Sequence, residues 1–499
     1  MRLKQLIGLF LFALISNTAF CQTTEVVSKR YDVTLRQAHM GSLEIDTMLL
    51  ESYTTLPANV RQFYLDARSV FEKDKKIDFT DSRIVKAAAQ NKMPLMAGPM
   101  LGDIKENGVS IWLRPSNKRP IRIKVTALGT KTEKTYTLKP AVAGKEERIV
   151  LNDLSPATKY KYVVLSRGTK IGGGAFETTS KIDDKIGLRL AFASDFHKVG
   201  LHNPNLVDAI LKREPIAMML LGDLAVDDRE NNMSMHRTDY LLRDVSEAWQ
   251  NLSANVPLYA AWDDHDYLNN DLSGLPEWFT KEDRTELRNL WRENWNNPKT
   301  DIEGINFNTR IGQLEIIMLD TRSYRTVEQR GQYDSYLGKE QLSWLKNVLA
   351  KSTAPFKIIS SGTMWSDYIS NGKDSWGTWD TQAREEIYKF IETENIPGVL
   401  LLSGDRHGAR GFTIPRDSGF EFYEFGPASL GGVPGPEGIA KDSSSQMFGY
   451  LGLGLKAFGE FTFNMEGTEP IVTFRLIDEL GNIMEEHTVP YSKLTPVGK

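Results

Sequence analysis

Residues 188–197 read LRLAFASDFH, and this stretch decides the fold class. Its first six residues are apolar apart from one arginine, which is typical of a strand buried on both faces. The apolar run ends at Ser194, and two ionisable side chains, Asp195 and His197, follow at once. A buried strand that runs into such residues is typical of an α/β sheet with a site at the carboxyl ends of its strands.

The same pattern recurs through the C-terminal two thirds of the chain. Further apolar runs of strand length lie at 216–221, 257–261, 314–319, 356–359 and 399–402. Stretches with helical spacing of apolar residues lie between some of them, at 240–252, 341–349 and 383–391. Buried strands that alternate with amphipathic helices predict a layered α/β architecture.

Ionisable side chains gather where these predicted strands end. Those that follow the apolar runs are Asp195 and His197, Asp223, the run DDHD at 263–266, Asp320 and Arg322, and Asp405 and His407. Because the carboxyl ends of strands in an open α/β sheet share one edge, we expect these residues to form one site.

These residue types suit a site with two cations. Carboxylate oxygens and neutral imidazole nitrogens bind Mn, Fe and Zn, and oxygen-rich sets also bind Mg and Ca. Two cations that share a carboxylate activate a water and stabilise a leaving oxygen, which suits hydrolysis of a phosphate ester. We therefore expect two or more metal ions, with Ca, Mn, Mg, Fe and Zn all open as identities.

The order of the motifs resembles that of the calcineurin-like metallophosphoesterases. The pattern D-x-H, G-D, (N/D)-H-(D/E) and a late G-x-x-H is present as Asp195/His197, Asp223, Asp264/His265/Asp266 and Gly404/His407. More narrowly, the chain is similar to the PhoD-like alkaline phosphatase family in WDDHD at 262–266, LDTRSYR at 319–325, LGxxQxxWL at 337–345 and SGDRH at 403–407. The resemblance covers about residue 98 to the C-terminus. It implies a layered metallophosphoesterase β-sandwich core flanked by helices.

The resemblance also implies a set of metal ligands. They are Asp195, His197 and His407 for one metal, Asp223 as the bridge, and Asp264 and Asp405 for the second metal. No tyrosine stands three residues after the bridging aspartate, where purple acid phosphatases bind ferric iron, because Val226 is there. The set is rich in carboxylate, which favours harder ions such as Ca, Mn, Mg or Fe over an all-histidine zinc site.

Three further residues receive catalytic roles from the resemblance. His265 would stay free of metal and stabilise the transition state or protonate the leaving oxygen, with Asp266 orienting its ring. Arg322 would clamp the phosphate, because its planar fork matches phosphate oxygens. The alternative for Arg322 is a pair with Asp320 or with a metal-bound carboxylate.

Residues outside these motifs are expected to have no chemistry of their own. Asp227 and Asp228 fit either outer groups of the site or a solvated loop. The histidines expected to be structural or exposed are His39, His202, His236 and His487.

The N-terminal part of the chain divides into three segments. We expect a signal peptide at 1–21, a partly helical segment at 22–95 and a β-sandwich domain at 96–180, ahead of a catalytic domain at 186–490. LSPATKYKY at 154–162 resembles the L-x-P-x-T-x-Y-x-Y signature of fibronectin type III-like domains, in which the first tyrosine packs and bonds at a corner. The predicted fold is therefore α/β, preceded by a small fibronectin type III-like β-sandwich.

The extreme N-terminus indicates export to the periplasm or the medium. Arg2 and Lys4 precede an apolar stretch at 6–15 that is too short for a stable anchor, and small residues follow it. Cys21 could instead carry a lipid, although the bulky Phe20 before it disfavours this. No later segment resembles a transmembrane helix.

Composition narrows the partners. With 25% charged residues and a net charge of -4, the chain has no bulk attraction for nucleic acid or an anionic membrane. The expected partner is a small phosphorylated substrate recognised by local groups, and the oligomeric state stays open. We predict a secreted metal-dependent phosphoesterase acting on monoesters, with a phosphodiesterase or nucleotidase as the near alternative and a non-catalytic surface binding protein as the distant one.

Overall fold

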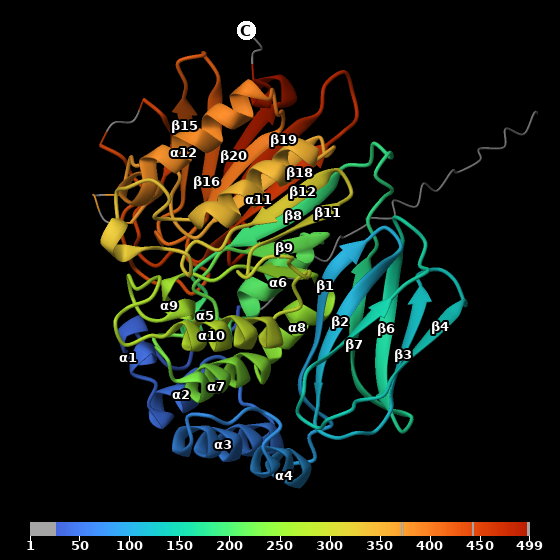
Figure 1. The fold of residues 1–499 in the computed structure, drawn as a ribbon. Helices are drawn as coiled ribbons and strands as arrows, with labels where there is room; N and C mark the ends of the chain where they lie inside the picture. Colours follow the sequence, from blue (N-terminus) through green and yellow to red (C-terminus); the bar gives the residue numbers. More distant parts are fainter. Residues whose placement is uncertain (1–25, 371, 373, 442–443, 497–499) are drawn as a thin grey trace, which may run out of the picture.

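Two large β-sheets face each other in the C-terminal two thirds of the chain (Figure 1). The structure is a computed structural model that describes residues 26–370, 372, 374–441 and 444–496. The signal peptide expected at 1–21 lies outside the described residues. All six apolar runs quoted from the sequence lie in strands of these two sheets.

The first large sheet has six strands. In spatial order they are β10 (Leu258–Ala260), β9 (Ala217–Leu220), β8 (Leu188–Ala193), β18 (Ala457–Asn464), β19 (Ile471–Asp478) and β20 (Ile483–Pro490). The first three are parallel, and β18 joins β8 in antiparallel fashion. The C-terminus of the chain therefore completes the sheet that begins with the LRLAFA run.

The second large sheet has seven strands. They are β11 (Phe307–Ile311), β12 (Leu314–Met318), β13 (Phe356–Ser361), β14 (Val399–Ser403), β16 (Glu421–Gly426), β15 (Arg410–Pro415) and β17 (Gln446–Gly449). The four strands from β12 to β16 in this order are parallel, as their apolar runs require.

Alternate residues of these strands serve two different cores. Phe425 of β16 points toward the six-stranded sheet, where its ring lies 5.3 Å from Phe461 and 4.7 Å from Phe474. Ile359 and Leu401 point the other way, toward α11 (Gly338–Lys351) and α12 (Trp376–Thr393). Because successive side chains of a strand face opposite sides, one run fills both cores.

Other helices cover the remaining face and the loops. They are α5 (His197–Gly200), α6 (Pro204–Lys212), α7 (Met233–Asp244), α8 (Glu247–Asn255), α9 (Asp264–Tyr267), α10 (Lys281–Asn294), and the short 3-10 helices η1 (Val327–Gln329) and η2 (Tyr491–Leu494). The single helix predicted at 240–252 is wrong in one respect. The hydroxyl of Ser246 accepts a hydrogen bond from Trp249 N and caps α8, so the chain breaks between α7 and α8.

The N-terminal part contains four helices and a small sandwich. The helices are α1 (Leu35–Met40), α2 (Leu43–Leu50), α3 (Ala58–Lys73) and α4 (Ser82–Gln90). The two antiparallel sheets contain β1 (Leu95–Lys105), β2 (Gly108–Pro115) and β5 (Glu147–Leu151), and β4 (Glu133–Leu138), β3 (Ile121–Ala127), β6 (Lys159–Ser166) and β7 (Thr169–Glu177). The predicted corner is confirmed, since Ser155 N donates to the hydroxyl of the buried Tyr160. The assignment to the fibronectin type III class stays a prediction.

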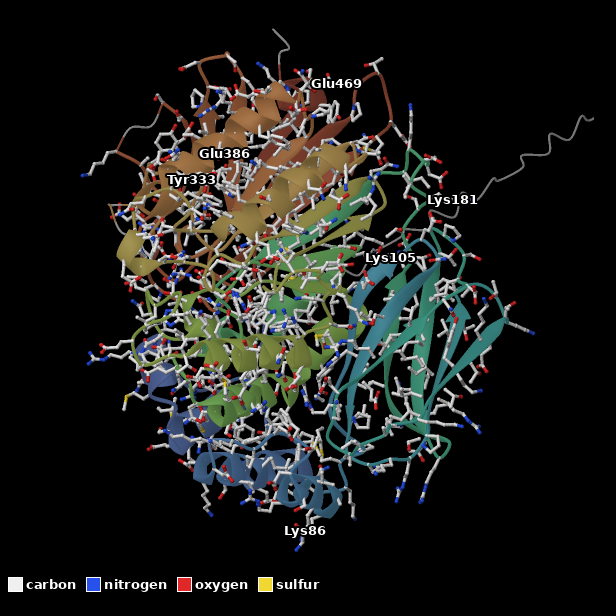
Figure 2. The ribbon with its side chains drawn as sticks, viewed as in Figure 1. Lys86, Lys105, Lys181, Tyr333, Glu386 and Glu469 are labelled. Atoms are coloured by element: carbon white, nitrogen blue, oxygen red, sulfur yellow. The ribbon has the colours of Figure 1, made fainter. Side chains whose placement is uncertain are left out.

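Polar contacts join the small sandwich to the C-terminal part of the chain. The hydroxyl of Tyr162 donates to Ala254 O at the end of α8, and Lys105 of β1 donates to Thr309 of β11, both within 2.9 Å (Figure 2). The side-chain amide of Asn296 donates to two carbonyls of β1 and β2. None of the helices in the described part is long and apolar enough to cross a membrane.

Candidate metal centre

The predicted ligands lie in turns at the carboxyl ends of four strands. Asp195 and His197 follow β8, Asp223 follows β9, Asp264 follows β10, and Asp405 and His407 follow β14. The first two turns are tied to each other, because Asp195 N donates to Gly222 O (3.0 Å) and His197 N to Asp223 O (2.9 Å). Strands of both large sheets thus contribute to one site.

Most of these ligand residues have a left-handed backbone. The φ angles lie between 44° and 56° at Asp195, His197, Asp223, Asp405 and His407. Residues other than glycine rarely adopt this conformation, and it costs about 1–3 kcal/mol at each position. Such strain concentrates at functional sites, where the surrounding fold holds it in place.

One group of donors combines a carboxylate and two imidazoles. Donor atoms of Asp195, His197 and His407 all lie within 4.8 Å of one another. The Nε2 atom of His407 is 3.5 Å from Asp195 Oδ1, and the Nε2 atom of His197 is 3.9 Å from Asp223 Oδ2. Asp223 therefore borders this group without belonging to it.

A second group consists of carboxylates alone. Oxygens of Asp223, Asp263, Asp264 and Asp405 lie within 4.8 Å of one another, so Asp223 stands between the two groups. Four buried atoms of the predicted ligands have no hydrogen-bond partner, namely Asp195 Oδ1, His197 Nε2, Asp223 Oδ2 and Asp264 Oδ1. Buried polar atoms are rarely left unpaired, so their convergence fits a site for cations.

The electrostatics of the carboxylate group lead to the same conclusion. Burial, reinforced by neighbouring aspartates, raises the pKa of Asp223 and of Asp405 well above the usual range. Burial also raises the pKa of Asp263 to about 6, although Arg322 opposes it. Several buried carboxylates in contact repel one another, and a divalent cation between them removes that cost.

His265 lies beside the second group without a free Nδ1. That atom is 2.7 Å from Asp228 Oδ1, which fixes the orientation of the ring. Burial lowers the pKa of His265, but the carboxylates of Asp264 and Asp228 outweigh it and raise the pKa to about 10. His265 is therefore a strong candidate to hold a proton next to the metal groups.

Comparison with known families agrees with this geometry. The model of the PhoD-like phosphatase family matches residues 221–446, which contain Asp223, Asp264, His265, Asp405 and His407. Residues 221–446 are thus similar to PhoD-like phosphatases. Alkaline phosphatase D of Bacillus subtilis (strain 168) is 27% identical over 220 residues, and the match spans 37% of this chain and 36% of that relative.

Solved structures extend the likeness beyond the PhoD-like domain. A structure of PhoD superposes with a TM-score of 0.63 at 18% identity, over 80% of this chain and 89% of that one. A purple acid phosphatase from yellow lupin (Lupinus luteus) seeds gives a TM-score of 0.59 at 12% identity, over 79% and 75%. The expected metallophosphoesterase fold is thus confirmed at the level of its layered α/β core.

The role predicted for Asp266 in the PhoD-like domain is wrong. Its carboxylate accepts hydrogen bonds from the backbone N–H groups of Leu224, Ala225 and Asp263 instead of contacting the ring of His265. Asp266 therefore holds the turn that presents Asp223. The ring of His265 is oriented by Asp228, one of the two outer aspartates whose role the sequence left open.

The phosphate clamp predicted for Arg322 stays a prediction, and the contacts of this side chain in the structure are with carboxylates. Arg322 is fully buried, and its Nε and Nη2 bind both oxygens of Asp263, while its Nη1 lies 2.9 Å from Asp374 Oδ2. It is 3.7 Å from Asp264 and Asp405. Arg322 therefore forms the alternative pair, with a carboxylate of the second donor group. A buried carboxylate without a cation beside it is strongly destabilising, and Arg322 provides that cation.

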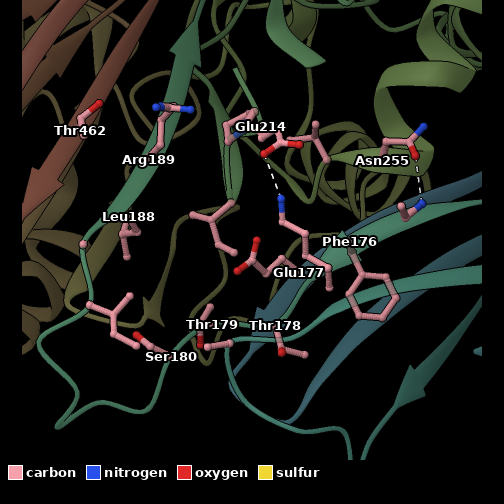
Figure 3. A pocket seen from close by; sticks show the side chains of 18 of the residues that line it. Phe176, Glu177, Thr178, Thr179, Ser180, Leu188, Arg189, Glu214, Asn255 and Thr462 are labelled. Carbon is pink, nitrogen blue, oxygen red and sulfur yellow. Dashed lines mark hydrogen bonds and ion pairs between the residues drawn. The ribbon is translucent and has the colours of Figure 1, made fainter. Parts of the chain in front are cut away.

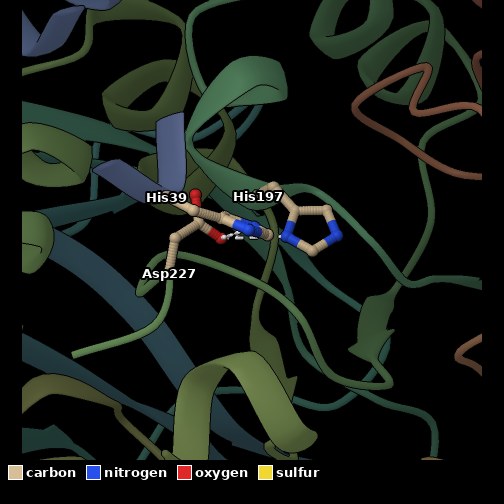
Figure 4. Close-up of side chains that lie close together, drawn as sticks. All are labelled: His39, His197 and Asp227. Carbon is tan, nitrogen blue, oxygen red and sulfur yellow. Dashed lines mark hydrogen bonds and ion pairs between the residues drawn. The ribbon is translucent and has the colours of Figure 1, made fainter. Parts of the chain in front are cut away.

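Four residues of the site were not among the predicted ligands. Asp227 lies 2.9 Å from Nδ1 of His197, and Asp228 holds His265. Their place in the sequence could have indicated these two aspartates, because both follow Asp223 in the same turn. Asp263 was not predicted because the motif assigns the ligand position to the next residue, Asp264. His39 comes from α1, far away in the sequence (Figure 4). The prediction that His39 lies outside the site is wrong, since it contacts both Asp227 and Asp228.

A larger cavity lies away from the metal groups. Its volume is about 850 Å³, and it is bordered by β6 and β7 of the small sandwich and by the beginnings of β8 and β9 (Figure 3). Lys159 and Glu214 form an ion pair of 2.9 Å across it. Because it borders the amino ends of β8 and β9, it belongs to the edge opposite the ligand turns.

Proposed function

We propose that this chain is a metal-dependent phosphoesterase that cleaves phosphate esters by direct attack of water. The observation that carries the proposal is the set of four buried donor atoms without partners, which converge from the ends of different strands. The similarity of residues 221–446 to the PhoD-like phosphatase family supports it.

The donor groups divide the work between two cations. Asp195, His197 and His407 would hold one, Asp263, Asp264 and Asp405 the other, and Asp223 stands between them. When bound, two divalent cations activate a water and neutralise charge on the phosphoryl oxygens. The structure is a fitting host, because each group offers buried oxygen or nitrogen donors that the protein itself does not satisfy.

The remaining side chains of the site orient its groups and supply a proton. His265, held at Nδ1 by Asp228, presents Nε2 and keeps a proton there that it can give to the leaving oxygen. Arg322 spaces the carboxylates, and Asp266 fixes the turn after β9. No covalent intermediate on the protein is required.

The substrate class proposed is a phosphate monoester, by analogy with the relative named alkaline phosphatase D. Monoester and diester hydrolysis use the same ligand types, so a diesterase is the outcome to be distinguished. Export is part of the proposal and rests on the signal-like sequence at 1–21.

The test is hydrolysis of p-nitrophenyl phosphate and bis-p-nitrophenyl phosphate by the mature chain. It is run with Ca, Mn, Mg, Fe and Zn at neutral and alkaline pH. Asp223→Asn and His265→Ala should each lower kcat/KM by more than about 100-fold, the upper range for loss of an outer partner in metal sites. His487→Ala, far away on β20, is the matched control and should retain full activity.

Either ester hydrolysed in a metal-dependent way supports the proposal, and the preferred ester identifies the class. A folded protein that hydrolyses neither ester with any of the metals contradicts it, and the binding-protein alternative then takes its place.

A further inference from the structure

The N-terminal helical segment contributes a side chain to the metal centre. His39, near the end of α1, lies with its ring centroid 4.5 Å from that of His265 and 6.0 Å from that of His197. Three histidines from distant parts of the chain therefore meet at one place. The ligand pattern predicted from the sequence does not include His39.

Each nitrogen of His39 is directed at a different carboxylate. Nδ1 lies 3.0 Å from Asp228 Oδ2. Nε2 lies 3.7 Å from Asp227 Oδ1, which is too far for a hydrogen bond (Figure 4). The same two carboxylates hold the rings of the other histidines, Asp227 at 2.9 Å from His197 Nδ1 and Asp228 at 2.7 Å from His265 Nδ1. His39 thus touches the partner of a metal ligand and the partner of the proton-holding residue.

Buried ion pairs hold α2, the helix that follows α1, in place. Asp46 of α2 is fully buried and pairs with Arg68 of α3 (2.9 Å) and with Lys198 of α5 (3.3 Å). Lys198 also contacts Asp239, which binds Arg229 beside the turn that carries Asp227 and Asp228. The docking of α2 is therefore tied to the residue directly after His197.

The turn between α1 and α2 is also fixed. Gly41 has φ 57°, its carbonyl accepts a hydrogen bond from Arg68 Nη2 (2.7 Å), and a Cβ there would lie 2.0 Å from Arg229 Nη1. Only glycine fits this close approach in a left-handed conformation. The chain that directly follows His39 is thus held in place.

We propose that His39 is a positioning residue of the phosphoesterase site, which acts through Asp228 on His265 and through Asp227 on His197. The proposal rests on the proposed function for its kinetic part. In metal sites the outer partners orient the inner groups, and their loss costs about 10- to 100-fold in activity or metal affinity. Nδ1 of His39 is engaged with Asp228, and the carboxylates of Asp227 and Asp228 are each engaged with another imidazole.

The first experiment compares four variants by steady-state kinetics and metal content. His39→Ala should lower kcat about 10- to 100-fold at saturating metal, with little change in KM. His39→Asn should keep most of the activity, because its amide can replace Nδ1 toward Asp228, and His39→Gln, which reaches toward Asp227, should keep less. Met40→Ala, an exposed neighbour in α1, is the matched control and should behave as wild type.

A double-mutant cycle tests the route of the effect. If His39 acts through Asp228, the losses in His39→Ala and Asp228→Asn will not add in the double variant. Full additivity, or wild-type kcat in His39→Ala, overturns the proposal. Loss of one metal equivalent in His39→Ala at saturating metal overturns it as well, because His39 would then be a ligand.

A measurement without turnover separates this proposal from the proposed function. In metal-free protein labelled with 15N-histidine, His39→Ala should shift the imidazole resonances of His265, and Met40→Ala should leave them in place. The resonance of His487 is the internal reference. Unmoved His265 resonances in His39→Ala contradict the proposal, whether or not the wild type hydrolyses a phosphate ester.

Discussion

The strained residues of the site explain why the ligands are ready before a cation arrives. Asp195, His197, Asp223, Asp405 and His407 all have positive φ angles, and hydrogen bonds between the turns hold them there. Each such residue costs about 1–3 kcal/mol that the rest of the fold must supply. A binding site whose geometry is already formed loses less entropy when its ligand binds.

Arg322 offers a residue-scale prediction. Arg322→Gln should lower the free energy of unfolding by about 3–5 kcal/mol, because it leaves Asp263 and Asp374 buried without their cation. Urea unfolding of the metal-free protein measures this, and Arg122→Gln at an exposed strand position should change it by less than about 0.5 kcal/mol. A variant with normal stability and a raised KM would support the phosphate-clamp role.

The sequence indicated which donor residues lie together, but not which residues orient them. Asp195, Asp223 and His407 stand directly after buried strands, so strand order alone brings them together. Which carboxylate faces the ring of His265 depends on the path of a turn, and the nearer candidate in the sequence, Asp266, binds backbone amides instead. Nothing in the sequence indicated that His39 reaches the site, because the sequence of a short helix does not reveal the surface on which the helix packs.

At the scale of elements, apolar runs located the parallel strands but not their antiparallel neighbours. The strands β18, β19 and β20 lie near the C-terminus, where β18 is largely buried and β20 is mostly exposed or half-buried, and the pairing of β18 with β8 joins the two ends of the C-terminal part. Ser246 divides the predicted helix at 240–252 because its side chain caps α8 more favourably than the helix continues. Pairing over long distances and local caps are both invisible to periodicity.

The helices α2, α3 and α5 give an element-scale prediction. Asp46→Ala should cost about 3–5 kcal/mol in unfolding free energy, since Lys198 and Arg68 would remain buried without their shared anion. Glu72→Ala removes the exposed partner of the same Arg68 and should cost less than about 1 kcal/mol. Equal losses in the two variants, measured by denaturant unfolding, would contradict the ionic account of how these helices dock.

At the scale of the molecule, a chain with a net charge of only -4 concentrates its negative charge in one buried place. The N-terminal helices, the six-stranded sheet and the seven-stranded sheet all meet there, with α1 beside α5 and α9 in Figure 1. Cations bound at this place would therefore connect the ligand turns of the two large sheets.

Metal removal gives a prediction for the whole molecule. The folded pKa values of Asp223, Asp263 and Asp405 are raised, so in metal-free protein their contribution is favourable near pH 4 and is lost as the pH rises through about 6 and above. Chelated protein should melt at a lower temperature at pH 8 than at pH 5.5, at about 1.4 kcal/mol per unit of pKa shift. Metal should restore the melting temperature mainly at pH 8.

Circular dichroism melts with and without chelator at the two pH values provide the measurement. Asp405→Asn removes one of the repelling charges, so its metal-free form should show a weaker dependence on pH. A chelated wild type that is equally stable at pH 5.5 and pH 8 would be incompatible with uncompensated carboxylates in the site.

The spread of the donors along the chain has a consequence for biosynthesis. The first group needs Asp195 and His407 together, and β18, which supports β8, is made later still. A growing polypeptide therefore exposes single carboxylates and imidazoles, none of which retains a divalent ion firmly. A cation that needs both Asp195 and His407 would therefore bind only after the chain has been made through His407, and the metal supply of the compartment where the chain folds would decide which ion is bound.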